Sequence, residues 1–169
     1  MKFGEFSDDK FFSFENSPLH LSFGKGLKAV EFILLTGKDT LIFLEAKTSC
    51  PNAANKDESV DKSQKFEEYY SDIADKFDHS FQMFLATVLK RKTLTTGIGK
   101  EILIKTDYSK TSFLFVLVIR TALNEEWLAG PKAELEHRLF RYRKIWGIKV
   151  LVLNEELAGK YGLIAKPDV

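Results

Sequence analysis

The stretch of residues 26–47 constrains the fold more than any other part of this 169-residue chain. Its two arms, residues 26–35 and 40–47, are rich in β-branched, aromatic and other apolar residues, and a Thr-Gly-Lys-Asp sequence joins them. This pattern predicts a β-hairpin. Because strand side chains alternate between two faces, Glu45 and Lys47 belong to one face at the end of an otherwise apolar strand.

Glu31 interrupts the first arm between two apolar residues, so three ionisable side chains gather at this hairpin. A carboxylate inside an apolar sheet is costly unless something neutralises it. Two carboxylates can hold Mg²⁺, which keeps several of its waters, and a lysine beside them can orient a water and contact a phosphate. The pattern therefore favours a metal site made by Glu31 and Glu45, with Lys47 beside it. The alternative is an ordinary Glu–Lys pair at a strand end.

Gly26, Glu31, Glu45, Ala46 and Lys47 resemble the core motif of the PD-(D/E)XK nuclease superfamily, especially its branch of archaeal Holliday-junction resolvases and Mrr-like restriction domains. The resemblance implies a nuclease in which Glu31 and Glu45 bind Mg²⁺, or Mn²⁺ in its place, and act with Lys47 as the catalytic residues. It also implies the backbone carbonyl of Ala46 as a further metal ligand. The motif departs from the family pattern because its first acid is Glu rather than the commoner Asp.

The resemblance also points to supporting residues outside the hairpin. Many family members carry a helix before the first strand, sometimes with a further acid, and often a glutamine on the helix that follows the Glu-x-Lys strand. Glu15, or else Glu5, is the candidate acid, and Gln64 is the candidate glutamine. For Gln64, an ordinary solvated side chain is the alternative.

The charge distribution is uneven although the net charge is only +1. Residues 1–83 carry 10 Lys and 15 Asp or Glu, whereas residues 84–153 carry 13 Lys or Arg and 6 Asp or Glu. An acidic part with a metal site beside a basic part is compatible with a nuclease. Arg138, Arg141 and Lys144 lie along one face of an expected helix and are candidates for nucleic-acid contacts, with a solvated face as the alternative.

The remaining patterns predict one mixed α/β domain over residues 1–169, with a central sheet flanked by helices, as in restriction-endonuclease-like domains. Apolar residues at three- and four-residue steps over 60–91 indicate a long amphipathic helix. The nearly continuous apolar run at 111–120 indicates a strand buried on both faces, parallel to the Glu-x-Lys strand. The expected order is β-β-β-α-β-α-β-α, with strands at 19–23, 26–35, 40–47, 111–120 and 148–153, a short extra strand at 101–104, and helices at 60–91, from Gly130 onward and after Asn154.

Several classes of protein do not fit the composition. No apolar run approaches the ~20 residues needed to cross a bilayer, and the N-terminus lacks signal-peptide features. The single cysteine, Cys50, cannot form an internal disulfide, which fits a reducing cytoplasm. We therefore expect a cytoplasmic protein that contacts no membrane. The resemblance implies a nucleic-acid partner, DNA rather than RNA, although the sequence itself does not distinguish the two. Resolvase-like family members often dimerise, so the resemblance is also compatible with a homodimer.

Two other interpretations remain open. The chain could be a non-catalytic nuclease-fold module that binds nucleic acid or another protein. Alternatively, the motif arises by chance in an unrelated α/β domain, in which case Glu31 should point away from Glu45 and Lys47. The sequence does not distinguish endonuclease from exonuclease action.

Overall fold

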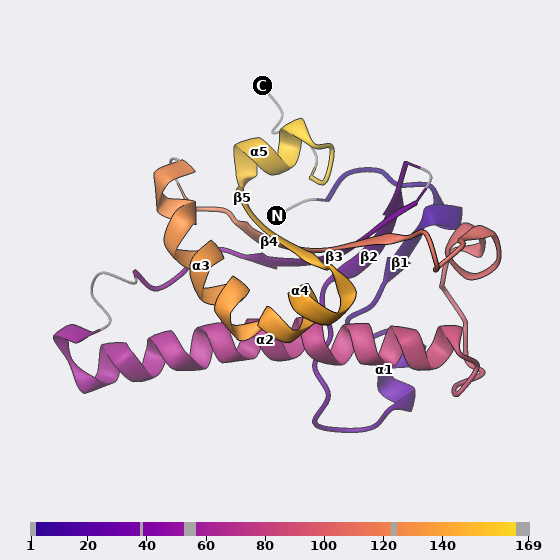
Figure 1. Cartoon of the computed structure of the whole chain (residues 1–169), viewed down its shortest axis with the longest axis horizontal. Helices are drawn as coiled ribbons and strands as arrows, with labels where there is room; N and C mark the ends of the chain where they lie inside the picture. Colours follow the sequence, from indigo (N-terminus) through magenta and orange to yellow (C-terminus); the bar gives the residue numbers. More distant parts are fainter. Residues whose placement is uncertain (1–2, 38, 53–56, 123–124, 165–169) are drawn as a thin grey trace.

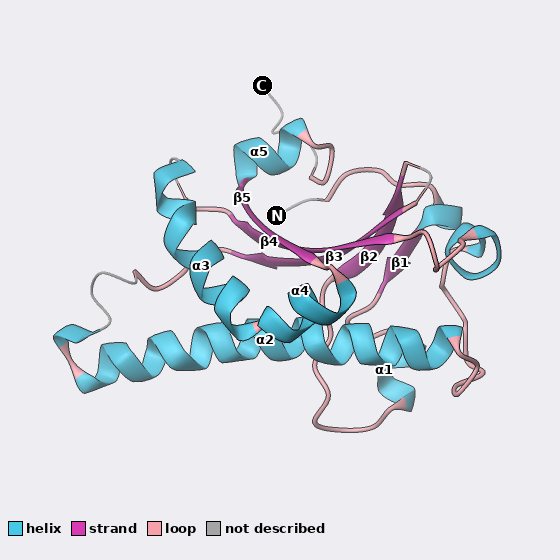
Figure 2. Ribbon diagram, viewed as in Figure 1, coloured by secondary structure: helices cyan, strands magenta, loops and turns pink. Residues whose placement is uncertain are grey.

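A computed structural model gives the fold and describes residues 3–37, 39–52, 57–122 and 125–164 (Figure 1). Lys38 of the expected hairpin turn, and residues 53–56 of the loop after the Glu-x-Lys strand, lie outside the described residues. A five-stranded mixed sheet lies between helices (Figure 2). Its strands follow each other across the sheet in chain order: β1 (Phe11–Ser13), β2 (Phe32–Thr36), β3 (Thr40–Lys47), β4 (Ser112–Ile119) and β5 (Lys149–Asn154).

The predicted hairpin is present, with β2 and β3 antiparallel and Thr36 opposite Thr40. Its first strand begins at Phe32 rather than at residue 26. The predicted parallel pairing of β3 with β4 is confirmed, with Lys47 opposite Ile119, and β5 extends the sheet in parallel beyond β4. The Glu-x-Lys strand thus has a neighbour on both sides, which fixes its position in the middle of the sheet.

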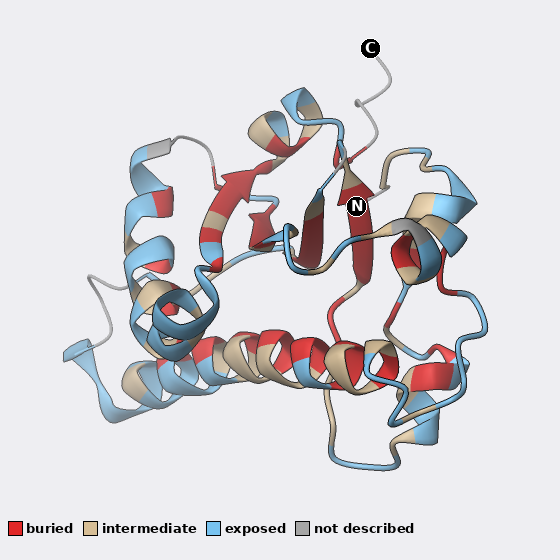
Figure 3. Ribbon diagram, turned by 45° about the vertical axis from the view of Figure 1, so that its right-hand side comes forward, coloured by how far each residue is buried: buried red, intermediate tan, exposed pale blue. Residues whose placement is uncertain are grey.

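The long helix α2 (Val60–Val88) makes the crossover between β3 and β4, as its apolar periodicity predicts. Its first turn is capped by Ser59, whose side chain accepts a hydrogen bond from the amide of Lys62. Figure 3 shows the buried side of this helix turned toward the sheet. The two layers interlock through rings: Phe77 stacks on Phe115 with centroids 4.8 Å apart, and Phe43 meets Phe84 edge-on at 5.6 Å.

A second layer of cover lies on the opposite face of the sheet. There α5 (Glu155–Lys160) and the N-terminal segment pack Ala158 and Phe3 against a smaller apolar cluster. The predicted cap of α5 is confirmed, because the Asn154 side chain accepts a hydrogen bond from the amide of Leu157 at 2.8 Å. Among the described residues, no helix is both long enough and apolar enough to cross a membrane.

The helix expected from Gly130 onward is present but divided. It forms α3 (Ala129–Arg138) and α4 (Phe140–Trp146), with an interruption at Leu139, and lies on the same side of the sheet as α2 (Figure 1). Leu135 and Leu139 are buried as the apolar pattern predicts. Trp146, which ends α4, is less enclosed, because 48% of its surface is exposed.

Two expected strands are absent. Residues 19–23 belong instead to the short helix α1 (Pro18–Ser22), because Pro18 suits a first helical position and Ser17 caps it by accepting from the amide of His20 at 3.1 Å. The first strand of the sheet is therefore β1. Residues 101–104 lie in the π-helix η3 (Glu101–Lys105), where the hydroxyls of Thr106 and Tyr108 take the carbonyls of Glu101 and Ile102 that a strand would use for pairing.

Ser80 of α2 holds the segment that leads to Glu31. Its buried hydroxyl accepts a hydrogen bond from the amide of Val30 at 2.9 Å. The Ser80→Ala substitution would leave a buried N–H without this partner, so we expect the free energy of unfolding in urea to fall by about 1–3 kcal/mol. Ser71→Ala, at an exposed position of the same helix, is the control and should change it by less than about 0.5 kcal/mol. Equal small effects would contradict this role of Ser80.

Candidate active site

The end of β3 turns Glu45 and Lys47 toward α2. Leu41 and Phe43 precede them on the same face and lie in the core under this helix. The Lys47 Nζ atom lies 3.2 Å from Glu45 Oε1. Glu45 is only 1% exposed, whereas 27% of the Lys47 side chain is exposed. The pair therefore has its carboxylate inside the protein and its ammonium group at the rim.

Lys76 of α2 contacts the same carboxylate from the other side. Its Nζ atom lies 2.9 Å from Glu45 Oε1 and 3.1 Å from Glu15 Oε1. Glu15, the predicted supporting acid, thus lies close to Glu45 with Lys76 between them. The second oxygen of Glu45, Oε2, is buried and has no hydrogen-bond partner among the described residues.

Two aspartates of α2 extend this arrangement on the Lys47 side. Asp72 Oδ2 lies 3.4 Å from Lys47 Nζ, and its Oδ1 lies 3.1 Å from the Nζ atom of Lys28. Lys28 also pairs with Asp75 at 2.9 Å. The ion pairs thus form one chain of alternating charges, here called the charge chain, which runs Glu15, Lys76, Glu45, Lys47, Asp72, Lys28 and Asp75.

Glu31 lies one residue before β2, next to this chain. Glu31 lies at a bend, and the next residue, Phe32, pairs with Leu44, the residue before Glu45. The charges of Glu15, Lys76 and Lys47 all act on the Glu31 carboxyl group. Glu31 therefore lies within electrostatic range of the two lysines that pair with Glu45.

Burial dominates the titration of the two motif carboxyls. It raises the pKa of Glu45, although the ammonium groups of Lys76 and Lys47 act in the opposite direction. Burial, followed by the negative charge of Glu15, raises the pKa of Glu31. A further cation at this point would lower both pKa values by favouring the charged forms, so both carboxyls have electrostatic reason to bind one.

The residues fit a metal that needs few protein ligands. Among residues 3–37, 39–52, 57–122 and 125–164, no three His, Cys, Asp or Glu side chains are grouped to hold a metal ion. Glu31 and Glu45 supply two carboxylates, and the buried Oε2 of Glu45 is an acceptor without a partner among the described residues. Ala46 points its side chain into the opposite core, so only its main chain can belong to this site. Two carboxylates and several waters are a set that Mg²⁺ accepts.

Gln64 lies away from this cluster. Its exposed side chain donates a hydrogen bond to Glu68 Oε1 at 2.8 Å. Asp72, the nearest member of the charge chain along α2, comes eight residues later, which is about 12 Å along a helix. The structure therefore gives no contact through which Gln64 would support the site.

The three basic residues of the predicted nucleic-acid face differ in their surroundings. Arg138 of α3 is paired with Glu67 and Glu134, each at 2.7 Å. Arg141 and Lys144 of α4 are exposed and form no ion pair with the residues that the structure describes. Arg138 thus holds α3 against α2, and only the other two present a charge to solvent.

Sequence reasoning missed four residues that complete the charge chain: Lys28, Asp72, Asp75 and Lys76. One signal was present for the α2 pair. Asp72 and Lys76 are four residues apart, and each directly precedes a buried residue of the apolar stripe, Ile73 or Phe77. Residues at that spacing share a helix face, so both could have been expected at the margin of the core.

Comparisons with protein-family models, with curated proteins and with solved structures gave no match. The five-stranded mixed sheet with flanking helices is compatible with the fold that the motif implies, and equally with other α/β domains. The function must therefore be argued from the residues of the site.

Removing Lys76 should destabilise the protein in a pH-dependent way. In Lys76→Met the buried Glu45 carboxylate loses one of its two ammonium partners, so we expect a loss of about 3–5 kcal/mol in the free energy of unfolding at pH 8. Burial already raises the pKa of Glu45 above the ordinary 4.5, and the substitution raises it further. A raised pKa favours the folded state when the group is protonated, so the loss should shrink as the pH falls toward 5.

The control for this prediction is Lys62→Met, which removes an exposed pair with Glu58. It should cost less than about 1 kcal/mol at either pH. Urea denaturation of both variants and the wild type at pH 5 and pH 8 measures the difference. A loss for Lys76→Met that is the same at both pH values would show that Glu45 is not the group left uncompensated.

Proposed function

We propose that this protein is a Mg²⁺-dependent nuclease that hydrolyses phosphodiester bonds of DNA at a site made by Glu31, Glu45 and Lys47. The observation that carries the proposal is the Glu45–Lys47 pair at the end of an interior strand. The pair is 3.2 Å apart, its ammonium group is at the rim, and a buried oxygen of its carboxylate has no hydrogen-bond partner among the described residues. The charges of Lys47 and Lys76, which pair with Glu45, also act on Glu31.

The charge of the cluster supports a divalent ion. Its ionised forms comprise three ammonium groups and five carboxylates, so two negative charges within the cluster are uncompensated by its own lysines. The excess negative charge lies on the more exposed carboxylates, since the buried Glu45 already contacts two ammonium groups. One Mg²⁺ ion would supply the missing charge. The eight groups are Glu15, Glu31, Glu45, Asp72, Asp75, Lys28, Lys47 and Lys76.

The roles of the residues follow from their burial. Glu31 and Glu45 would hold the metal, which when bound supplies an activated water and neutralises charge on the scissile phosphate. Lys76 contacts the Glu45 carboxylate through Oε1, and Oε2, which makes no ion pair with the described residues, would be the metal ligand. Lys47 is partly exposed, and its ammonium group can contact a phosphate oxygen and orient the attacking water.

Substitutions in the motif should abolish cleavage. Single-stranded, duplex and branched DNA, and RNA, are incubated with Mg²⁺ or Mn²⁺. We expect Glu45→Gln and Lys47→Ala each to lower the cleavage rate of the DNA substrates by about 10²–10³-fold, because each removes a charge that acts on the reacting phosphate or its metal. Glu68→Gln and Lys65→Ala, at exposed positions of α2, are the matched controls and should retain the rate. Cleavage that survives both motif substitutions would remove this site from the mechanism.

A second candidate function rests on Lys76. Its ammonium group already contacts Glu45 at 2.9 Å, so the charge chain can be read as a structural ion-pair network in a non-catalytic nuclease-fold module that binds nucleic acid or protein. Calorimetric titration with Mg²⁺ and Mn²⁺ separates the two functions. Binding that is weakened by Glu31→Gln and by Glu45→Gln favours the nuclease, whereas absence of binding in the wild type favours the module.

Arg141 and Lys144 should contribute to nucleic-acid binding without sequence preference. Because each exposed cation can neutralise one phosphate, the Arg141→Ala/Lys144→Ala variant should bind DNA more weakly and reduce the slope of log K against log salt concentration by about 2. Lys62→Ala/Lys65→Ala removes the same charge from pairs with Glu58 and Asp61 and is the control. Fluorescence anisotropy in EDTA measures both. Identical slopes for the two variants would exclude α4 from the interface.

A further inference from the structure

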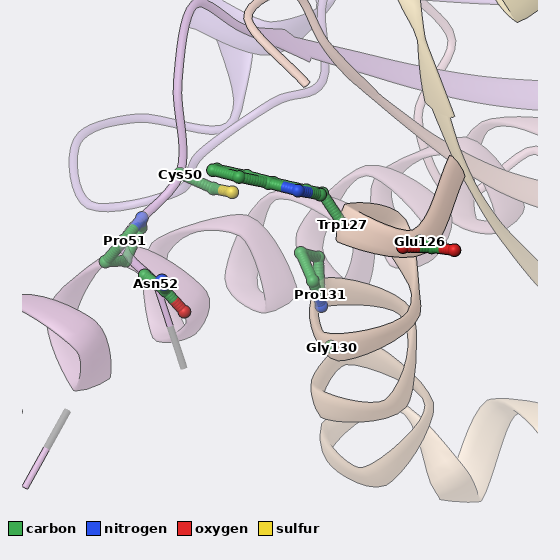
Figure 4. Close-up of a pocket in the computed structure, with 7 residues that line it drawn as sticks. All are labelled: Cys50, Pro51, Asn52, Glu126, Trp127, Gly130 and Pro131. Carbon is green, nitrogen blue, oxygen red and sulfur yellow. The ribbon is translucent and has the colours of Figure 1, made fainter. Parts of the chain in front are cut away.

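A pocket of about 280 Å³ opens beside the end of β3 (Figure 4). One wall is the loop that follows β3, with Cys50, Pro51 and Asn52. The other is formed by the 3₁₀ helix η4 (Glu125–Leu128) and the start of α3. Figure 4 shows the ring of Trp127 extending from η4 toward Cys50, and 60% of the Trp127 surface is exposed.

The pocket and the proposed active site lie at the same end of the sheet. β3 and β4 are parallel, so the loops that leave their carboxyl ends start side by side. Lys47 is three residues before Cys50, which places their Cα atoms within about 11 Å of each other. Cys50 and Leu128 both pack against the core on the α2 side, which is also the side of Glu45. The buried hydroxyl of Tyr69 lies within electrostatic range of both the pocket and the proposed active site, since the charges of Cys50 and Glu45 both act on it.

The chemistry of the walls matches a flat, partly polar ring better than a phosphate. Trp127, Pro51 and Pro131 supply apolar surface, and a tryptophan face stacks on any nucleobase. Asn52 and Glu126 supply an amide and a carboxylate that can meet the hydrogen-bonding edge of a base. The Glu126 carboxylate would repel a phosphate, and no Lys or Arg is among the described residues that line the pocket. The volume lies below the usual range for larger ligands, about 300–1,000 Å³, and suits one ring system.

We propose that this pocket binds an unstacked nucleobase of the nucleic acid strand, with Trp127 as its stacking platform, within a few nucleotides of the phosphate at Lys47. The inference rests on the nuclease function proposed above and specifies its substrate. A base inside a duplex has both faces covered by its neighbours and must first be flipped out at a cost, whereas a single-stranded or unpaired nucleotide can enter directly. The site therefore selects single-stranded, frayed or branched nucleic acid over continuous duplex.

The chain has two tryptophans, which allows a direct optical test. In Trp146→Phe, Trp127 is the only tryptophan, and the ring at position 146 that contacts Phe81 is kept aromatic. Titration with a single-stranded DNA oligonucleotide in EDTA should quench the fluorescence of this variant. An oligonucleotide made only of abasic nucleotides has the same phosphates and should not quench it. The reciprocal variant, Trp127→Phe, reports from Trp146 alone. Because Trp146 ends α4 two residues after Lys144, any change in its fluorescence should be the same with the abasic strand.

Affinity gives the second readout. Trp127→Ala should weaken binding of the single-stranded oligonucleotide by roughly 5- to 150-fold and leave binding of blunt duplex within twofold, whereas Trp127→Phe should retain most of the affinity. No quenching of Trp127, equal quenching of Trp127 by the abasic and the base-bearing strand, or an unchanged affinity in Trp127→Ala would each overturn the pocket assignment.

The outcome also separates this inference from the proposed function. Quenching of Trp127 in EDTA, without cleavage of any substrate when Mg²⁺ or Mn²⁺ is added, retains the pocket and rejects the nuclease. Cleavage that depends on Glu45 and Lys47, without quenching of Trp127, retains the nuclease and rejects the pocket.

Discussion

The contact between Lys76 and Glu45 is the interaction on which the rest of the site depends. It joins the middle of the crossover helix α2 to the end of β3, and both side chains are almost completely buried. Two charges in such a place stabilise each other only while both are present, because each alone would be desolvated without compensation. Lys76 also forms an ion pair with Glu15, so that two carboxylates from distant parts of the sequence contact one ammonium group. The geometry of the carboxylates is thereby fixed before any ligand arrives.

The apolar pattern predicted the parts of the fold in which local preference and packing agree. The hairpin, α2 and the strand at 112–119 each have an apolar pattern that is clear enough to specify the type of element, and their apolar residues are buried accordingly. The pattern failed at residues 19–23, where a five-residue alternation was outweighed by the cap of Ser17 and the proline that follows it. It failed again at 101–104, where two side-chain hydroxyls donate hydrogen bonds to backbone carbonyls that would otherwise pair with a neighbouring strand. Short segments carry too few positions for periodicity to outweigh a cap or a turn.

The residues of the site were likewise only partly predictable from the sequence. Glu45 and Lys47 could be placed from sequence because they lie on one strand, two residues apart, and their common face follows from the pleat. Lys76 and Asp72 belong to another element, and their contact with β3 depends on how α2 turns its faces over the sheet. Trp127 could not be predicted as part of a pocket, since its partner wall comes from a loop 75 residues earlier. Side chains that meet across elements require the fold itself.

The parallel pairing of β3 and β4 continues past the strands: the amides of Arg120 and Thr121 donate to the carbonyls of Lys47 and Thr48, each at 3.0 Å. These two hydrogen bonds hold the backbone of Lys47 and Thr48 to the segment that follows β4. A change in the position of the pocket wall at Cys50 and Asn52 that keeps these bonds must therefore begin after Thr48. The end of β3 is therefore held in place by its neighbour, whereas the pocket wall at Cys50 and Asn52 lies beyond this pairing. Substitutions in that wall can change which ligands fit the pocket without changing the backbone that carries Lys47.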